Sequence, residues 1–130
     1  RGSKVAHQVE VPKWIMNSKK YSFACLRGLF DTDGGLYIHR HRNYKNTWNN
    51  LGWCFTNHSV PLVQACRSIL LSAKIQPRGD ERRVYLYAVG NIRKFLEVIG
   101  SSNQKNIDLY NLYMKEYYRY EWKRRGAGVV

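Results

Sequence analysis

Apolar residues recur at spacings of three and four over residues 19–32, as they do on the buried face of a helix. The core-facing stripe consists of Phe23, Leu26 and Phe30. Ser18 precedes the segment and is expected to cap the helix, because its side-chain oxygen can accept a hydrogen bond from a first-turn amide. A shorter helix is expected just upstream, after Pro12.

Two segments after this helix alternate between apolar and polar residues, a pattern typical of strands with one buried face. In the first, over 36–43, Leu36 and Ile38 share the inward face. Its outward face carries Tyr37, His39, His41 and Asn43. The second strand is expected over 51–57, with Leu51, Trp53 and Phe55 inward and Asn50, Gly52, Cys54 and Thr56 outward. The polar residues 44–50 are expected to form the hairpin loop between them.

The second half of the chain begins with another helix signal. Ser59 is expected to cap a helix over about 60–73, whose apolar positions fit a buried face. A short extended segment follows over 75–78. Gly79 and Asp80 then predict a turn that leads into the next strand.

Alternation predicts that this strand covers 83–89, with Val84, Leu86 and Ala88 facing inward. Helices are expected over about 91–99 and, with an amphipathic pattern, over about 104–124. The element order is therefore α-β-β-α-β-β-α with an extra C-terminal helix. This order predicts an α+β fold in which helices cover one face of a four-stranded antiparallel sheet.

The length of 130 residues suits one domain with its own core. We expect an N-terminal arm over 1–11, a single domain over 12–125 and a flexible tail over 126–130. The chain has 22 basic and 9 acidic residues and a formal net charge of +13, which favours a polyanionic partner. Nucleic acid is the leading candidate, and no basic amphipathic helix with an aliphatic face favours a membrane.

The three cysteines form no CxxC pair, so neither a zinc knuckle nor a disulfide framework is predicted. No apolar run approaches 18 residues and no signal peptide is evident, so we expect a soluble, cytoplasmic protein.

The predicted helix over 19–32 ends beside two acidic residues, Asp31 and Asp33. Carboxylates are electrostatically disfavoured there, because the C-terminus of a helix is partly negative. A divalent cation would offset this repulsion, so the pattern predicts a metal site. A calcium loop of the EF-hand type is excluded, because the glycine comes too early and no closing Glu follows at the required spacing.

Small residues form a second stripe on this helix, spaced by fours: Ala24, Gly28 and Thr32. Such a stripe lets two backbones approach closely, which offsets the cost of about 1 kcal/mol for glycine inside a helix. The partner is either a second helix or a strand of the same subunit.

Residues 26–34, Leu-Arg-Gly-Leu-Phe-Asp-Thr-Asp-Gly, resemble the motif of the LAGLIDADG homing endonucleases. Phe30 and Thr32 are mild departures from the motif, and Arg27 in place of a small residue is the largest. With the element order around it, the resemblance extends over residues 12–122. It implies a saddle-shaped antiparallel sheet that binds in the DNA major groove, with the motif helices at the interface between two units.

The chain contains one copy of the motif. The resemblance therefore implies a homodimer with Ala24, Gly28 and Thr32 at its interface, and a near-palindromic target. The implied activity is that of an intron-encoded, site-specific double-strand DNA endonuclease. An RNA-splicing maturase, with intron RNA as partner, and a catalytically inactive DNA-binding regulator are the alternatives. A general basic RNA-binding protein is disfavoured, because it leaves the acidic helix end unexplained.

The resemblance also implies catalytic roles. Asp33 and its symmetry mate would bind Mg²⁺ or another divalent cation, which serves phosphodiester hydrolysis. Asp31 would either join it as a ligand or stabilise the helix end. Asn57 matches a residue that positions water, and Lys105 is the candidate base near the scissile phosphate. Two neighbours could hold the place of Lys105 instead: Asn103 and Asn106.

The outward face of the predicted sheet is rich in side chains that can contact DNA, and we favour a ligand-binding face over a solvated one. The candidates for base contacts are Tyr37, His39, His41, Asn43, Asn50, Cys54, Gln76, Arg78, Arg83, Tyr85 and Tyr87. Phosphate contacts are expected from Arg40, Arg42, Lys45 and the basic residues 123–125. His39 and His41 could suggest a zinc pair, but no third ligand is evident.

Overall fold

A computed structural model describes the backbone of residues 9–42 and 47–124 and the side chains of residues 9–40 and 49–116. The expected tail, and the expected arm before residue 9, lie outside this description. The helices are α1 (Lys13–Met16), α2 (Lys19–Asp33), α3 (Val60–Ser72), α4 (Val89–Val98) and α5 (Gln104–Arg124). The strands are β1 (Gly34–Arg42), β2 (Thr47–Thr56), β3 (Arg78–Gly79) and β4 (Arg83–Leu86).

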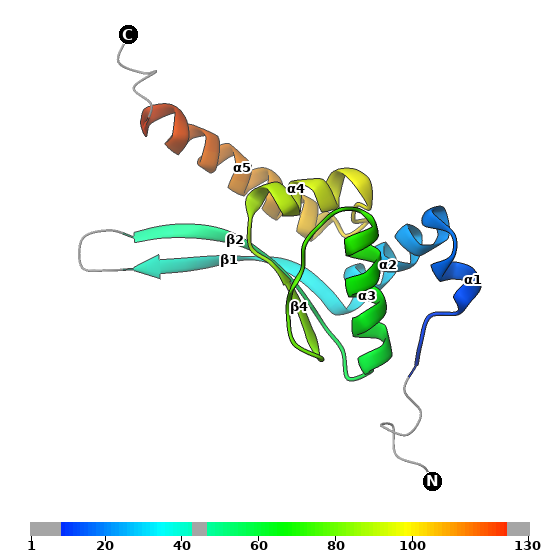
Figure 1. The fold of residues 1–130 in the computed structure, drawn as a ribbon. Coiled ribbons are helices and arrows are strands. Elements are labelled where there is room, and N and C mark those ends of the chain that lie inside the picture. Colours follow the sequence, from blue (N-terminus) through cyan, green and yellow to red (C-terminus); the bar gives the residue numbers. More distant parts are fainter. Residues whose placement is uncertain (1–8, 43–46, 125–130) are drawn as a thin grey trace.

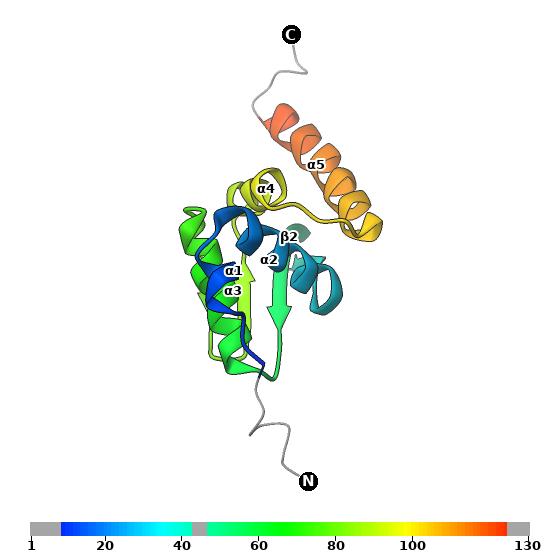
Figure 2. The ribbon, with the colours of Figure 1, turned by 90° about the vertical axis from the view of Figure 1, so that its right-hand side faces the viewer.

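The four strands form one antiparallel sheet in the order β1-β2-β4-β3. The β1–β2 hairpin extends beyond β4 and α3, and α4 and α5 lie above β2 in two perpendicular views (Figure 1, Figure 2). Helices α2, α3, α4 and α5 pack on the face of the sheet that carries the apolar side chains, and α1 packs against α2. The expected α+β fold, with helices on one face of the sheet and an extra C-terminal helix, is therefore confirmed.

Three aromatic rings form the centre of the core between α2, β2 and α4. Phe30 stacks on Trp53 with ring centroids 4.8 Å apart, and Phe95 meets both rings edge-on at 5.0 Å. All three side chains are fully buried, as are Leu26 and Phe55. Phe30 belongs to the last turn of α2, so this cluster also fixes the helix end that carries the two acidic residues.

The caps follow the sequence expectations closely. The Ser18 hydroxyl accepts a hydrogen bond from the Tyr21 amide at 3.2 Å, and α2 begins at the next residue. The Ser59 hydroxyl accepts one from the Leu62 amide at the start of α3. Because capping depends on nearby residues only, sequence reasoning located both helix starts.

The boundaries of the hairpin and of the second strand pair differ from expectation. Residues 47–50 belong to β2 and not to a loop, because they pair through the backbone with the outer half of β1. The strand expected over 83–89 ends at Leu86, and α4 begins at Val89, with exposed Ala88 as its N-cap. The inward position expected for Ala88 is thus wrong. Of the extended segment 75–78, only Arg78 enters the sheet.

Candidate functional site

Asp33 is the last residue of α2, and its side chain is exposed. One carboxylate oxygen, Oδ2, accepts a hydrogen bond from Nδ2 of Asn57 at 2.9 Å. Oδ1 of Asn57 accepts the Ser59 amide at 2.8 Å, so the Asn57 side chain is fixed at both ends. Within the described residues no hydrogen bond reaches Oδ1 of Asp33. The arrangement leaves one carboxylate oxygen, held in a defined direction, for a ligand.

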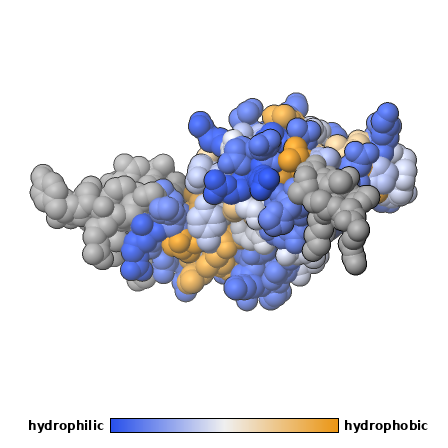
Figure 3. Space-filling view, turned by 90° about the horizontal axis from the view of Figure 1, so that it is seen from below, coloured by the Kyte–Doolittle hydropathy of each residue, from blue (hydrophilic) through white to orange (hydrophobic). Residues whose placement is uncertain are grey.

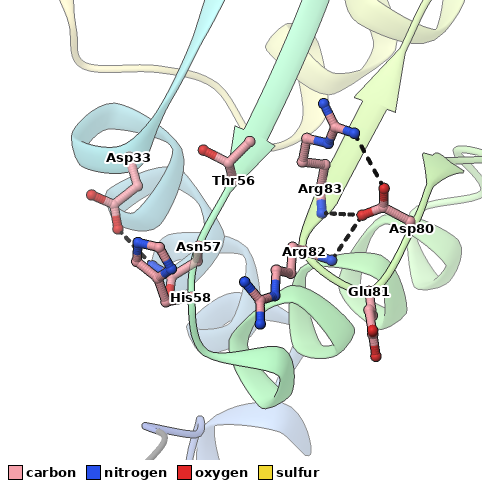
Figure 4. A pocket seen from close by; sticks show the side chains of 8 residues that line it. All are labelled: Asp33, Thr56, Asn57, His58, Asp80, Glu81, Arg82 and Arg83. Carbon is pink, nitrogen blue, oxygen red and sulfur yellow. Dashed lines mark hydrogen bonds and ion pairs between the residues drawn. The ribbon is translucent and has the colours of Figure 1, made fainter. Parts of the chain in front are cut away.

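A hollow of about 680 Å³ lies beside Asp33 (Figure 4). Three segments meet there: the end of α2, the loop between β2 and α3, and the turn between β3 and β4. Besides Asp33 and Asn57, its lining includes His58, Asp80, Glu81 and Arg82. Sequence reasoning did not propose these four residues for the site. For His58 the only available signal was its position directly after Asn57.

The turn between β3 and β4 is fixed by hydrogen bonds. The Asp80 carboxylate accepts hydrogen bonds from the backbone amides of Arg82 and Arg83 at 2.9 and 3.1 Å. It also forms an ion pair with the Arg83 guanidinium at 3.4 Å. The hydrogen bond from the Arg82 amide, with smaller contributions from Arg83, lowers the pKa of Asp80. Arg67 of α3 donates to the carbonyls of Asp80 and Arg83 at 2.6 and 3.0 Å. One wall of the hollow is therefore held together by hydrogen bonds.

Asp31 has different neighbours from Asp33. It is partly buried, and its two carboxylate oxygens accept hydrogen bonds from the Ser101 hydroxyl at 2.5 Å and the Ser102 amide at 2.7 Å. Both donors belong to the loop that precedes α5. Asp31 thus connects the end of α2 to this loop.

Lys105, the candidate base, is exposed in the first turn of α5. Its backbone amide donates a hydrogen bond to Oδ1 of Asn103 at 3.0 Å, and Asn103 thereby caps the helix. The Asn106 side chain is buried, and its Oδ1 accepts the Leu36 amide at 3.1 Å. Of the three candidates for the basic position, only Lys105 combines a cationic side chain with exposure.

The small stripe of α2 faces outward. Ala24, Gly28 and Thr32 are exposed, and a Cβ added at Gly28 would meet no atom within 4 Å. A tight contact with a strand of the same subunit, one of the two readings of the sequence, is therefore wrong. The stripe is an exposed surface of α2.

Aromatic side chains gather on the outward face of the sheet. The Tyr37 ring covers Gly52 across the β1–β2 pair, so closely that a Cβ at Gly52 would lie 2.3 Å from it. Tyr85 stacks on Tyr87 with centroids 5.6 Å apart, and the Arg83 guanidinium lies 5.6 Å from the Tyr85 ring. Burial is the main cause that raises the pKa of Tyr37, and the nearby Tyr87 adds to it. Burial also raises the pKa of Cys54, which pairs with Tyr85 in the sheet.

A second hollow of about 520 Å³ lies at the β3–β4 end of this face, and it brings together four of the predicted DNA-contact residues. They are Gln76, Arg78, Tyr85 and Tyr87, and the first turn of α4 adds Asn91. Sequence reasoning missed Asn91 because the preceding strand was extended too far and α4 was started too late.

The outer half of the hairpin carries the remaining predicted contacts. His39, Arg40 and Asn50 are exposed there. Figure 3 shows the molecule from below, on the side of the hairpin that faces away from α5 in Figure 1. This face is mostly hydrophilic and has a smaller apolar patch. The side chains of His41, Arg42, Lys123 and Arg124, and all of Asn43, Lys45 and Arg125, lie outside the described residues.

No cluster of three His, Cys, Asp or Glu side chains that could hold a metal ion occurs in the part of the chain that the structure describes. Asp33 is therefore not part of a ready-made metal site within these residues. Within the same residues, no helix has the length and apolar character needed to cross a bilayer.

Comparison with known proteins agrees with this fold. The fold resembles the crystal structure of the LAGLIDADG homing endonuclease I-GzeII in complex with DNA target, with a TM-score of 0.55 and 12% sequence identity. The match covers 78% of this chain and 37% of that one, so this chain spans little more than a third of that endonuclease. No curated protein sequence matches the chain. The LAGLIDADG-like domain family matches residues 20–106, and the chain belongs to this family.

Proposed function

We propose that the protein is a site-specific double-strand DNA endonuclease. It would hydrolyse phosphodiester bonds with the help of a divalent cation, for which Mg²⁺ is the first candidate. The observation that carries the proposal is the Asp33 carboxylate, held by Asn57 with one oxygen open to a ligand. The net charge of +13 and the exposed His, Arg and Tyr side chains of the sheet face support a polyanionic substrate. The similarity to a DNA-bound homing endonuclease supports DNA as that polyanion.

The donor set fits magnesium. Mg²⁺ prefers oxygen ligands, keeps several waters and is usually bound by one or two carboxylates. Asp33 would supply one carboxylate, and Asp33 of a second copy would supply the other. When bound, the cation would neutralise charge on the leaving oxygen and activate a water. Asn57 holds the carboxylate, and its second amide hydrogen, which has no acceptor among the described residues, would orient a water. Lys105 would stabilise charge at the scissile phosphate.

Removing the cation tests the activity. Linear DNA that carries a candidate intron-insertion sequence should be cut in the presence of Mg²⁺, and EDTA should abolish cutting while DNA binding persists. Cutting that is unaffected by EDTA would exclude metal-dependent hydrolysis. Binding without cutting under all conditions would favour the regulator, and tighter binding to intron RNA than to DNA would favour the maturase.

A homodimer formed through α2 is part of this proposal, because it would bring two Asp33 residues together. We expect Gly28→Leu to shift the protein from dimer to monomer in sedimentation velocity, because the larger side chain separates the two helices. Gly90 on α4 is a matched control: like Gly28, it is exposed and helical and has open space around its Cβ position. Gly90→Leu should remain dimeric. A dimeric Gly28→Leu protein would exclude the α2 interface.

A further inference from the structure

The acidic residues at the end of α2 differ in what surrounds their oxygens. Oδ1 of Asp33 has no hydrogen-bond partner among the described residues, whereas both oxygens of Asp31 accept hydrogen bonds from the loop before α5. A cation ligated by Asp31 would have to compete with two short hydrogen bonds, one of them from a backbone amide that has no other described acceptor. Asp31 is therefore poorly suited to bind a metal.

The hydrogen bonds of Asp31 continue along the chain to Lys105. The Ser101 hydroxyl, which donates to Asp31, also accepts the Asn103 amide at 3.1 Å. Asn103 in turn caps α5 through the Lys105 amide at 3.0 Å. Three successive hydrogen bonds thus link the Asp31 carboxylate to the backbone of Lys105.

A second connection holds the same helical turn from the other side of Asp33. The side chain of the buried Asn106 accepts a hydrogen bond from the backbone amide of Leu36, and Leu36 lies three residues after Asp33. The first turn of α5 is thereby attached to the chain both before and after Asp33. Asp31 also lies just ahead of the N-terminus of α5, where the helix dipole favours a negative charge. This position offsets the unfavourable place of Asp31 at the C-terminus of α2.

We propose that Asp31 is a positioning residue: it fixes the first turn of α5, and with it Lys105, relative to Asp33, and it does not bind the cation. The expected change in kcat rests on the endonuclease function proposed above. Misplacing a reacting group by about 1 Å can lower a rate by about 100-fold, so the positioning has a measurable consequence.

Asp31→Asn tests this role, because it retains the size of the side chain but turns one acceptor into a donor facing the loop. We expect kcat for DNA cleavage to fall by about 10–100-fold with little change in KM. In a Lys105→Ala background the same substitution should lower kcat by less than about threefold, because the two residues act through one interaction. Equal losses in both backgrounds would overturn the proposal.

Calcium and magnesium titrations followed by thermal unfolding separate positioning from ligation. Asp31→Asn should retain the cation-dependent rise in Tm, and Asp33→Asn should lose it. Loss of the rise in Asp31→Asn would make Asp31 a ligand and overturn the proposal. Asp108→Asn is the control for the substitution itself, because Asp108 is exposed on α5 and its hydrogen bond within the described residues is the local one with Gln104.

Hydrogen exchange of the segment 100–107 gives a readout that needs no nuclease activity. Its amides should exchange faster in Asp31→Asn than in the wild type, and at the wild-type rate in Asp33→Asn and Asp108→Asn. Unchanged exchange in Asp31→Asn would overturn the positioning role, whether or not the protein cuts DNA. A protein that cuts no DNA would refute only the proposed endonuclease function. Should Asp31→Asn fail to fold, Ser101→Ala removes one of the two hydrogen bonds and should give the same pattern with smaller changes.

Discussion

Asp33→Asn is expected to lower the rate of DNA cleavage by about 10²–10⁴-fold. The substitution removes the carboxylate charge, and a bound metal ion contributes several kcal/mol of charge stabilisation to a transition state, with each 1.36 kcal/mol worth tenfold in rate. The side-chain oxygen of the new residue can still accept the hydrogen bond from Asn57 that Oδ2 accepts now. The fold should therefore persist while the chemistry is lost.

Single-turnover cleavage at saturating Mg²⁺ measures this effect, with DNA binding followed on the same target. Binding should stay within a few fold of the wild type or become tighter, because the protein loses a negative charge near the phosphates. Asp108→Asn should cut at the wild-type rate. Wild-type cutting by Asp33→Asn would remove Asp33 from the mechanism.

Phe30→Ala is expected to lower the free energy of unfolding by about 3–5 kcal/mol, the usual loss when a buried Phe becomes Ala. The Phe30 ring has no exposed surface, stacks on Trp53 at 4.8 Å and touches Phe95 edge-on. It also lies against the backbone of Gly34, where an added Cβ would be 2.6 Å from the ring. The ring thus supports both the core and the residue that follows Asp33.

Urea denaturation of Phe30→Ala and Phe30→Leu measures this contribution. Phe30→Leu fills more of the space and should lose less stability than Phe30→Ala. The midpoint should shift with little change in the m-value if only native packing is affected. A loss below about 1 kcal/mol for Phe30→Ala would show that the aromatic cluster is not the centre of the core.

Local signals in the sequence predicted most of the fold. The spacing of Leu26 and Phe30 and the cap at Ser18 were sufficient for α2, which ends one residue later than expected. The start of β2 was missed because Asn49 and Asn50 carry no apolar pattern. They are held in the strand by backbone pairing with Arg40 and His39, which alternation does not detect.

The candidate site was predicted less completely, because it depends on contacts between distant residues. Asp33 and Asn57 were both expected from the family resemblance, and the structure joins them by a hydrogen bond. The contact between Asp31 and Ser101 spans 70 positions and begins in a loop without periodicity, so no sequence signal predicted it. His58 and Arg82 were missed for the same reason.

The outer half of the β1–β2 hairpin has a consequence for how this protein can change. His39 and Arg40 pair through their backbones with Asn50 and Asn49. The exposed side chains of Arg40, Asn49 and Asn50 are not part of the hydrophobic core. Surface substitutions of this kind usually alter stability by no more than about 0.5 kcal/mol. Side chains that contact DNA there under the proposed function could therefore vary with little effect on folding. A lineage could acquire new binding preferences by point mutation at these positions without first acquiring spare stability.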